Sequence, residues 1–138
     1  MTGKNLCFAL MLVVALSACK KENLQNAPID LTVSEGFSNP IGFYSAKPSF
    51  SWKLPAGIKA QSAYSVAVAS SPDLLPNKAD LWGSGKVESE QNLYVQYEGE
   101  KLSSRQKVYW QLKFWDEQGT ESVWSEIAFF ELGLLKNS

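Results

Sequence analysis

Hydrophobic and polar residues alternate with a period of two along several short stretches of this chain. The clearest stretch is residues 107–119, KVYWQLKFWDEQG, whose last four residues have turn chemistry. The apolar face of this predicted strand consists of Val108, Trp110, Leu112 and Phe114. The opposite face is mixed and consists of Tyr109, Gln111, Lys113 and Trp115. A strand so rich in large aromatic residues needs strands on both edges and a second sheet over its inner face.

The same alternation recurs in other segments that turn residues separate. They are residues 29–34, 48–54, 62–70, 81–87, 93–97 and 123–132. Segment 81–87 is expected to be a weak edge strand, because Gly83 and Gly85 interrupt it. Residues 71–80 contain two prolines and an asparagine and are expected to form a loop. About seven short strands with almost no helical periodicity predict an all-β fold, an antiparallel immunoglobulin- or fibronectin-III-like β-sandwich.

The N-terminal segment is predicted to be a signal peptide rather than part of the sandwich. Lys4 precedes an apolar run over residues 6–16. As a helix this run would rise about 16 Å, which is too short for a hydrocarbon core of about 30 Å. A secretory signal fits this length better. The sequence LSAC that follows resembles the lipobox of bacterial lipoproteins, in which Cys19 would carry the lipid; the alternative is an ordinary signal peptide followed by an incidental cysteine.

The predicted organisation is a lipoprotein signal peptide at 1–18, a polar tether at 19–27 and the sandwich at 28–138. Cys7 lies in the removed segment and Cys19 would be lipidated, so no thiol remains for a disulfide or for catalysis. Because Lys20 rather than aspartate follows the cysteine, the resemblance implies an exported outer-membrane lipoprotein. The membrane would then be a partner, on its periplasmic or its cell-surface side.

Composition excludes several classes of function. The 138 residues carry a formal charge of -1, and Lys and Arg are scattered, so no basic patch for nucleic acid is expected. The sequence contains no histidine, which removes the commonest general base, the usual catalytic triads and most zinc sites. We therefore expect no metal site, no cofactor and no nucleic-acid partner.

Several motifs follow one another in order along the predicted sandwich. They are NPIGF (39–43), PSFSW (48–52), QSAYSVAVASS (61–71), DLWGSGKV (80–87), VYWQLKFWDEQG (108–119), SVWSE (122–126) and FFELGLL (129–135). Trp52 in the second strand and the aromatic sixth strand resemble fibronectin type III domains. More narrowly, residues 29–135 resemble the N-terminal module of bacterial α-L-rhamnosidases.

This resemblance implies a non-catalytic role. In the family, the module precedes further β-sandwich domains and a helical barrel, and the barrel holds the acidic pair that cleaves the glycosidic bond. The resemblance therefore implies that this chain spaces and braces a catalytic region away from the membrane. Its implied partners are the adjoining hydrolase domains of a longer parent chain.

Carboxylate pairs within the chain are not expected to form a glycosidase site. Such a site needs two carboxyl groups facing each other across a pocket at about 5–9.5 Å. The candidate pairs are Glu88 with Glu90, Glu98 with Glu100 and Asp116 with Glu117. All of them fall in predicted turns or at strand ends, so we expect solvated charges, no catalytic residue and no enzyme activity in this chain alone.

A free-standing carbohydrate-binding lipoprotein of a glycan-utilisation system is the alternative function. Trp115, Tyr109 and Trp82 are the candidate residues, because a pyranose ring stacks on a flat aromatic ring. The same side chains would otherwise contact an adjoining domain, and on the isolated module they would then form one exposed apolar patch built from Trp115, Tyr109, Leu134 and Leu135. The ligands would be rhamnose-containing glycans. Trp52, Trp110 and Trp124 are instead expected in the core.

Overall fold

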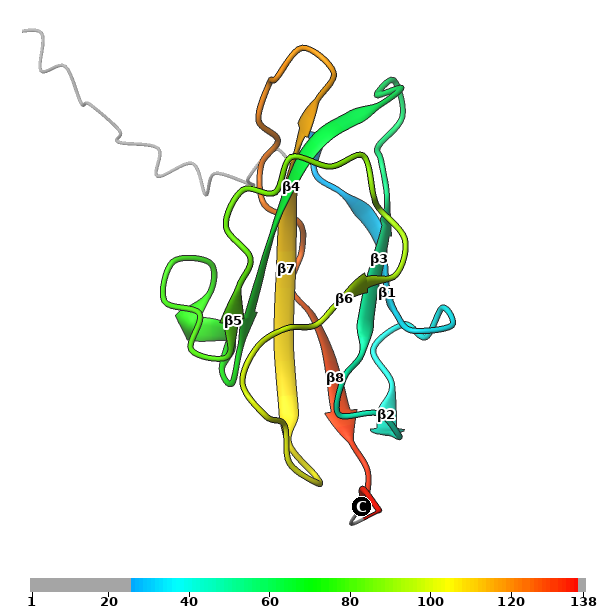
Figure 1. The fold of residues 1–138 in the computed structure, drawn as a ribbon, viewed down its shortest axis with the longest axis vertical. Coiled ribbons are helices and arrows are strands. Elements are labelled where there is room, and N and C mark those ends of the chain that lie inside the picture. The colour runs from blue at the N-terminus through cyan, green and yellow to red at the C-terminus, as the bar shows by residue number, and fades with distance from the viewer. Residues whose placement is uncertain (1–25, 137–138) are drawn as a thin grey trace, which may run out of the picture.

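The computed structural model describes residues 26–136, which form two β-sheets packed face to face (Figure 1). The three-stranded sheet has the order β1 (Ile29–Val33), β3 (Ser49–Lys53) and β6 (Val95–Gln96). The five-stranded sheet has the order β2 (Ile41–Phe43), β8 (Ala128–Leu132), β7 (Lys107–Asp116), β4 (Gln61–Ala69) and β5 (Trp82–Gly83). A short 3-10 helix, η2 (Pro72–Leu74), interrupts the predicted 71–80 loop. The all-β, immunoglobulin-like sandwich is confirmed.

Strand β7 lies at the centre of the larger sheet, between β4 and β8. Its register pairs Trp110 with Val68 of β4 and with Ala128 of β8. The predicted inner face is confirmed, because four side chains of β7 are at most 1% exposed: Val108, Trp110, Leu112 and Phe114. Alternation alone therefore placed the side chains of this strand correctly.

The core fills the space between the two sheets. From the smaller sheet, Phe50 and Trp52 point inward and are fully buried. The Phe50 ring lies 4.4 Å from that of Trp110, measured between centroids, and 6.4 Å from that of Phe130 in β8. Because strands from residue 33 to residue 132 supply this cluster, the module has a hydrophobic core of its own.

Three predicted strands are shorter than the sequence pattern suggested. Segment 81–87 forms only the two-residue β5, and Gly85 beyond it has a φ of +63° that departs from a strand. Segment 93–97 forms only β6, because Tyr94 has a φ of +57°. In segment 123–132, the strand begins only at Ala128.

The segment between β7 and β8 replaces strand pairing with serine side chains. The Oγ atoms of Ser122 and Ser125 accept hydrogen bonds from the backbone N–H groups of Phe114 (3.0 Å) and Leu112 (3.1 Å). This irregular course turns Trp124 out of the core, and its side chain is only half-buried. The prediction that Trp124 belongs to the core was therefore wrong.

Strand β2 was not predicted, and it makes the sandwich not wholly antiparallel. It runs parallel to β8, with Ile41 opposite Glu131 and Phe43 opposite Leu132. The Phe43 ring is buried and lies 5.9 Å from the Phe130 ring. Three residues centred on a glycine give too little alternation for a sequence pattern to detect.

The described chain begins and ends at opposite ends of the sandwich (Figure 1). Ile29, the first residue of β1, pairs with Lys53, which lies at the end where β7 finishes. The chain leaves β8 at the other end, where Lys107 starts β7 opposite Glu131. The ten residues of β7 extend about 33 Å, which sets the scale of the separation. The predicted signal peptide, Cys19 and most of the tether lie outside the described residues.

Candidate functional site

Aromatic side chains gather on the outer surface of the five-stranded sheet. We call this surface the outer aromatic face and define it by Tyr109, Trp115, Trp124 and Phe129, all half-buried. Tyr109 lies directly opposite Phe129 in the β7–β8 register, which places both rings on the same side of the sheet. On β4, the residues opposite Trp115 and Tyr109 are Ala63 and Ala69, so the two rings lie beside small neighbours. Both alanines are fully buried, which shows that the surrounding side chains cover them.

Lysine ammonium groups lie close to these rings. Nζ of Lys113 is 5.3 Å from the Trp115 ring centroid and 4.9 Å from that of Trp124. Nζ of Lys86 is also 4.9 Å from the Trp115 centroid. At these distances a cation is attracted to the face of an aromatic ring. Lysine side chains therefore occupy space beside Trp115 in which a sugar ring would have to stack.

In the other half of the outer aromatic face, a lysine again lies beside two aromatic rings. Nζ of Lys107 lies 4.6 Å from the Phe129 centroid and 5.5 Å from that of Tyr109. Lys113, in the first half, also forms an ion pair with Glu121. The face is thus a set of lysine-paired rings rather than a bare aromatic platform.

The structure separates Trp82 from the other two candidate residues. Trp82 pairs with Val68, whose side chain points into the core, and it packs against the core cluster. Its ring is stacked on Phe50, with centroids 6.2 Å apart and an angle of 18°, and lies edge-on to Tyr97 at 5.6 Å. Trp115 and Tyr109 therefore share the outer aromatic face, whereas Trp82 closes the edge of the core.

The candidate carboxylates have the contacts of surface and turn residues. Oδ1 of Asp116 accepts hydrogen bonds from the backbone N–H groups of Gln118 (2.9 Å) and Thr120 (2.8 Å), which closes the turn after β7. Glu88 is exposed and lies 3.3 Å from the ammonium group of Lys86. The remaining four candidates are exposed: Glu90, Glu98, Glu100 and Glu117.

A groove opens at the end of the sandwich where the described chain finishes. We call it the C-terminal groove, and three segments form it: residues 44–47 after β2, residues 101–104 before β7 and residues 134–136. Tyr44 and Leu134 are 60% and 75% exposed. The Tyr44 hydroxyl donates a hydrogen bond to Oε2 of Glu35 (2.6 Å), which lowers the pKa of that carboxyl and raises the pKa of Tyr44.

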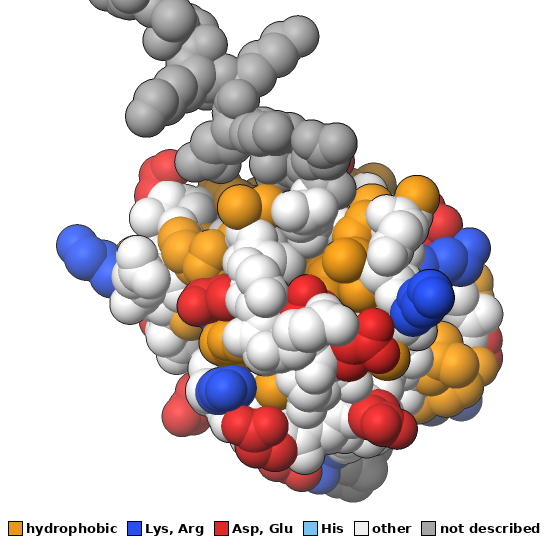
Figure 2. Space-filling view, turned by 90° about the horizontal axis from the view of Figure 1, so that it is seen from above, with side chains coloured by type: hydrophobic (Ala, Val, Ile, Leu, Met, Phe, Trp, Pro, Cys, Tyr) orange, Lys and Arg blue, Asp and Glu red, His pale blue; other side chains and the backbone are white. Residues whose placement is uncertain are grey.

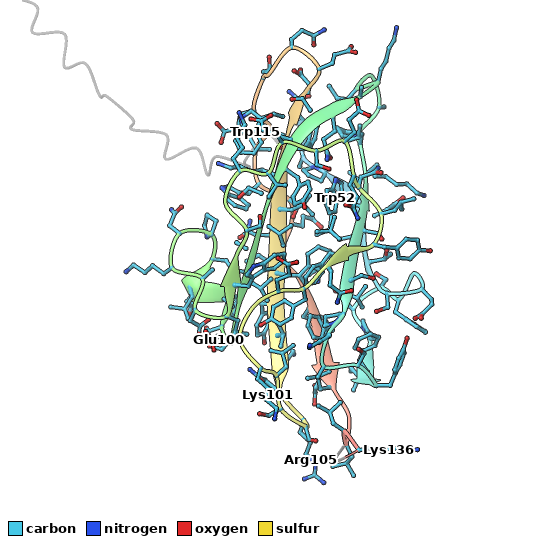
Figure 3. All side chains as sticks on the ribbon, in the orientation of Figure 1. Trp52, Glu100, Lys101, Arg105, Trp115 and Lys136 are labelled. Atoms are coloured by element: carbon cyan, nitrogen blue, oxygen red, sulfur yellow. The ribbon has the colours of Figure 1, made fainter. Side chains whose placement is uncertain are left out.

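This position corrects one expectation from the sequence. Leu134 and Leu135 were expected to extend a single apolar patch with Trp115 and Tyr109. Figure 3 shows Trp115 near one end of the sandwich and Lys136 at the other. Because the leucines directly precede Lys136, they belong to the C-terminal groove and are separate from Trp115. The groove was missed because its lining comes from three loops without periodicity.

Two further observations concern the described part of the chain. Residues 26–136 contain no helix that is long and apolar enough to span a membrane. Within the same residues, no three or more Asp, Glu, His or Cys side chains cluster as metal ligands would.

Comparison with protein families gives a match over nearly all of the described residues. The family described as the Rha78A-like, N-terminal immunoglobulin domain matches residues 28–136. An α-L-rhamnosidase of Formosa agariphila is 53% identical over 126 residues, which are 90% of this chain and 14% of the relative. An α-L-rhamnosidase of an Alteromonas species is 42% identical, and the match covers 94% of this chain and 15% of the relative. The chain thus spans about one seventh of the length of these curated relatives.

Solved structures give the same result. The α-L-rhamnosidase from Dictyoglumus thermophilum superposes with a TM-score of 0.73 at 35% identity, over 80% of this chain and 13% of that one. The Streptomyces avermitilis α-L-rhamnosidase, complexed with L-rhamnose, gives a TM-score of 0.67 at 38% identity, over 75% of this chain and 10% of that one. Both similarities are confined to a small part of a much longer enzyme.

Proposed function

Since this chain belongs to the Rha78A-like N-terminal immunoglobulin domain family, we propose that it spaces and braces the catalytic region of a longer α-L-rhamnosidase-like hydrolase. The chain itself corresponds to the non-catalytic module. The observation that carries the proposal is the coverage: 90% of this chain matches only 14% of its Formosa relative. Most of such a relative, including its catalytic region, lies outside the part that this chain matches.

The position of the chain ends supports a spacing role. Ile29 and Lys136 lie at opposite ends of the sandwich, separated by about the 33 Å length of β7 (Figures 1 and 3). A module whose ends were adjacent would add little distance between an N-terminal attachment point and a following domain. This module instead adds its full length to that distance.

The proposed attachment point is Cys19. The apolar run, the LSAC sequence and the polar tether together fit a lipoprotein of the outer membrane, with the membrane as partner. The first strand of the sandwich, β1, then begins at Ile29, at the end remote from Lys136. The catalytic region would therefore be held on the far side of the module from the lipid.

A free-standing carbohydrate-binding lipoprotein is the second candidate function. The observation that favours it is the outer aromatic face, where Tyr109 and Trp115 lie on one surface and are only half-buried. The three lysines paired with these rings weigh against neutral sugar stacking. A contact with another part of the parent protein explains the same rings without a sugar.

Sequencing the gene beyond codon 138 tests the proposed function. We expect an open reading frame that continues into further β-sandwich domains and a helical barrel. A stop codon there, with no rhamnosidase-like gene beside it, would instead support the free-standing lipoprotein.

A further inference from the structure

We propose that the C-terminal groove is the docking surface for the domain that follows this module in its parent chain. The complementary surface on that domain is an apolar side chain flanked by carboxylates. This inference rests on the proposed function, since it requires a parent with a following domain. It adds which surface makes the contact and what chemistry the partner presents.

The groove has an apolar floor and exposed apolar walls. Leu102 is 1% exposed and belongs to the core, and Ala46 and Leu135 pack against that core from outside. Above this floor, Leu134 and Tyr44 are 75% and 60% exposed. Large apolar side chains exposed around a hollow mark sites of interaction. An apolar side chain inserted into the groove would be removed from water against Leu102, Leu134 and Tyr44.

The charged side chains that line the groove are cations. Lys47, Lys101 and Lys136 are on its lining, which includes no carboxylate among the described residues, while Glu35 contacts the groove only through the Tyr44 hydroxyl. Arg105 extends from the same end of the molecule as Lys136 (Figure 3). Glu100 precedes this segment, and its side chain is exposed outside the groove lining.

The opposite end of the sandwich carries charges of both signs. The turn and loop after β7 carry Asp116, Glu117, Glu121 and Glu126. Figure 2 shows acidic side chains distributed over that end, together with Lys and Arg side chains. The lining of the C-terminal groove, by contrast, is basic, although the whole chain has a formal charge of -1. A partner surface that presents carboxylates would be complementary in charge to the lysines of the groove.

The backbone at the exit holds the chain in a fixed direction. The Gly133 N–H donates to the carbonyl of Phe43 (2.9 Å), and the Gly133 carbonyl accepts from the N–H of Arg105 (3.1 Å). The Leu135 N–H donates to Oγ of Ser104 (2.9 Å). A Cβ on Gly133 would lie 3.1 Å from the carbonyl oxygen of Gly42, so two glycines permit this close approach.

The position of residues 134–136 indicates which domain would occupy the groove. Residues 134–136 form one wall of the groove, so a domain that follows them begins at the groove itself. Tethering at this distance raises its effective concentration there above that of any free partner. The relatives are about seven times as long as this chain, which provides such a domain.

A chimera with the Formosa α-L-rhamnosidase tests the proposal. Residues 28–136 replace the corresponding N-terminal module of the Formosa α-L-rhamnosidase, and thermal unfolding of the module is compared in the chimera and in the isolated chain. We expect the module to unfold about 5 °C or more higher in the chimera. Leu134→Ser, or Lys101→Glu with Lys136→Glu, should abolish this rise without changing the isolated chain.

Matched controls lie at the other end of the sandwich. Val123→Ser removes an apolar side chain that is 45% exposed, and Lys59→Glu reverses an exposed charge. Both should leave the rise intact. An unchanged unfolding temperature in the chimera, or equal losses in groove and control variants, would overturn the docking proposal.

Hydrolysis of a rhamnoside by the chimera distinguishes failure of the docking surface from failure of the proposed function. A chimera that is active but shows no coupling through the groove refutes the docking surface and leaves the proposed function standing. A chimera that does not fold or hydrolyse, while the Formosa enzyme and the isolated chain both fold, counts against both.

Discussion

The indole Nε1 of Trp52 donates a hydrogen bond of 3.0 Å to Oε1 of Gln61, and both residues are at most 3% exposed. Because an indole N–H can only donate, this bond fixes the orientation of the glutamine amide. Nε2 of Gln61 then donates to the carbonyls of Ser89 (3.0 Å) and Gln91 (2.9 Å). One glutamine therefore joins both sheets to the loop between β5 and β6.

Gln61→Leu should destabilise the module by about 2 kcal/mol, because it leaves the buried Trp52 N–H and two carbonyls without their partner. Chemical denaturation of the purified chain measures this loss. Gln118→Leu in the exposed turn after β7 is the matched control and should change stability by less than about 0.5 kcal/mol. Equal effects of the two substitutions would contradict this role for Gln61.

The burial of Trp52 could be predicted from the sequence, but its hydrogen bond could not. Alternation along residues 48–54 places Trp52 on the apolar face of its strand. Gln61 lies nine residues further on, at the start of another strand in the other sheet. Their contact depends on how the two sheets stack, which no local pattern encodes.

Trp110→Ala should cost about 3–5 kcal/mol of folding free energy, since it removes a fully buried ring from the middle of the core. Trp115→Ala, in the same strand, should cost less than about 2 kcal/mol, because its ring is only half-buried on the outer aromatic face. Chemical denaturation compares the two variants directly. Equal losses would show that the two faces of β7 are wrongly assigned.

Sequence patterns were least informative where side chains replace strand pairing. Along the edge of β7 that faces away from β4, the hydroxyls of Ser122 and Ser125 bind the backbone, so apolar residues in segment 122–127 no longer alternate between core and solvent. Trp124 was misassigned for this reason. Long, regular β7 was predicted well because cross-strand neighbours on both sides enforce its period of two.

Asp80 should contribute stability that disappears in acid. Its carboxylate accepts hydrogen bonds from the backbone N–H (2.8 Å) and hydroxyl (2.5 Å) of Ser70, and these hold its pKa below the ordinary value of 3.8. A lowered pKa means that this stability is present above the unfolded-state pKa and is lost as the pH falls through the folded-state value.

The free energy of unfolding of Asp80→Asn should therefore fall less than that of the wild type between about pH 5 and about pH 2. Chemical denaturation at each pH measures this difference. Asp73→Asn removes a charge from the same loop and keeps the Ser70 contacts, so it serves as the control. Identical pH profiles for wild type and Asp80→Asn would refute the contribution of this carboxylate.

The lipid anchor makes a separate prediction. If LSAC is a lipobox, the expressed protein should partition into membranes and incorporate labelled fatty acid, and Cys19→Ala should abolish both. A single acyl chain binds membranes only marginally, whereas several chains anchor a protein durably. Wild-type protein that is unlabelled and remains in the supernatant would exclude lipidation at Cys19.

The candidate contact residues were predictable only in part. Alternation along β7 placed Tyr109 and Trp115 together on the outer face. Trp82 sits in a two-residue edge strand, too short for alternation to assign its side, and it turned out to pack on Phe50. The C-terminal groove joins loops some 90 residues apart in sequence, and only the fold brings them together.

Calorimetric titration of the purified chain with rhamnose-containing oligosaccharides tests most directly whether this module braces a hydrolase or binds sugar itself. We expect no measurable binding, because lysine side chains already lie against the Trp115 and Tyr109 rings. We also expect no rhamnoside hydrolysis by the chain alone. Micromolar binding that is lost in Trp115→Ala, but kept in the control Tyr94→Ala beside the other sheet, would contradict the bracing role and identify a carbohydrate-binding module.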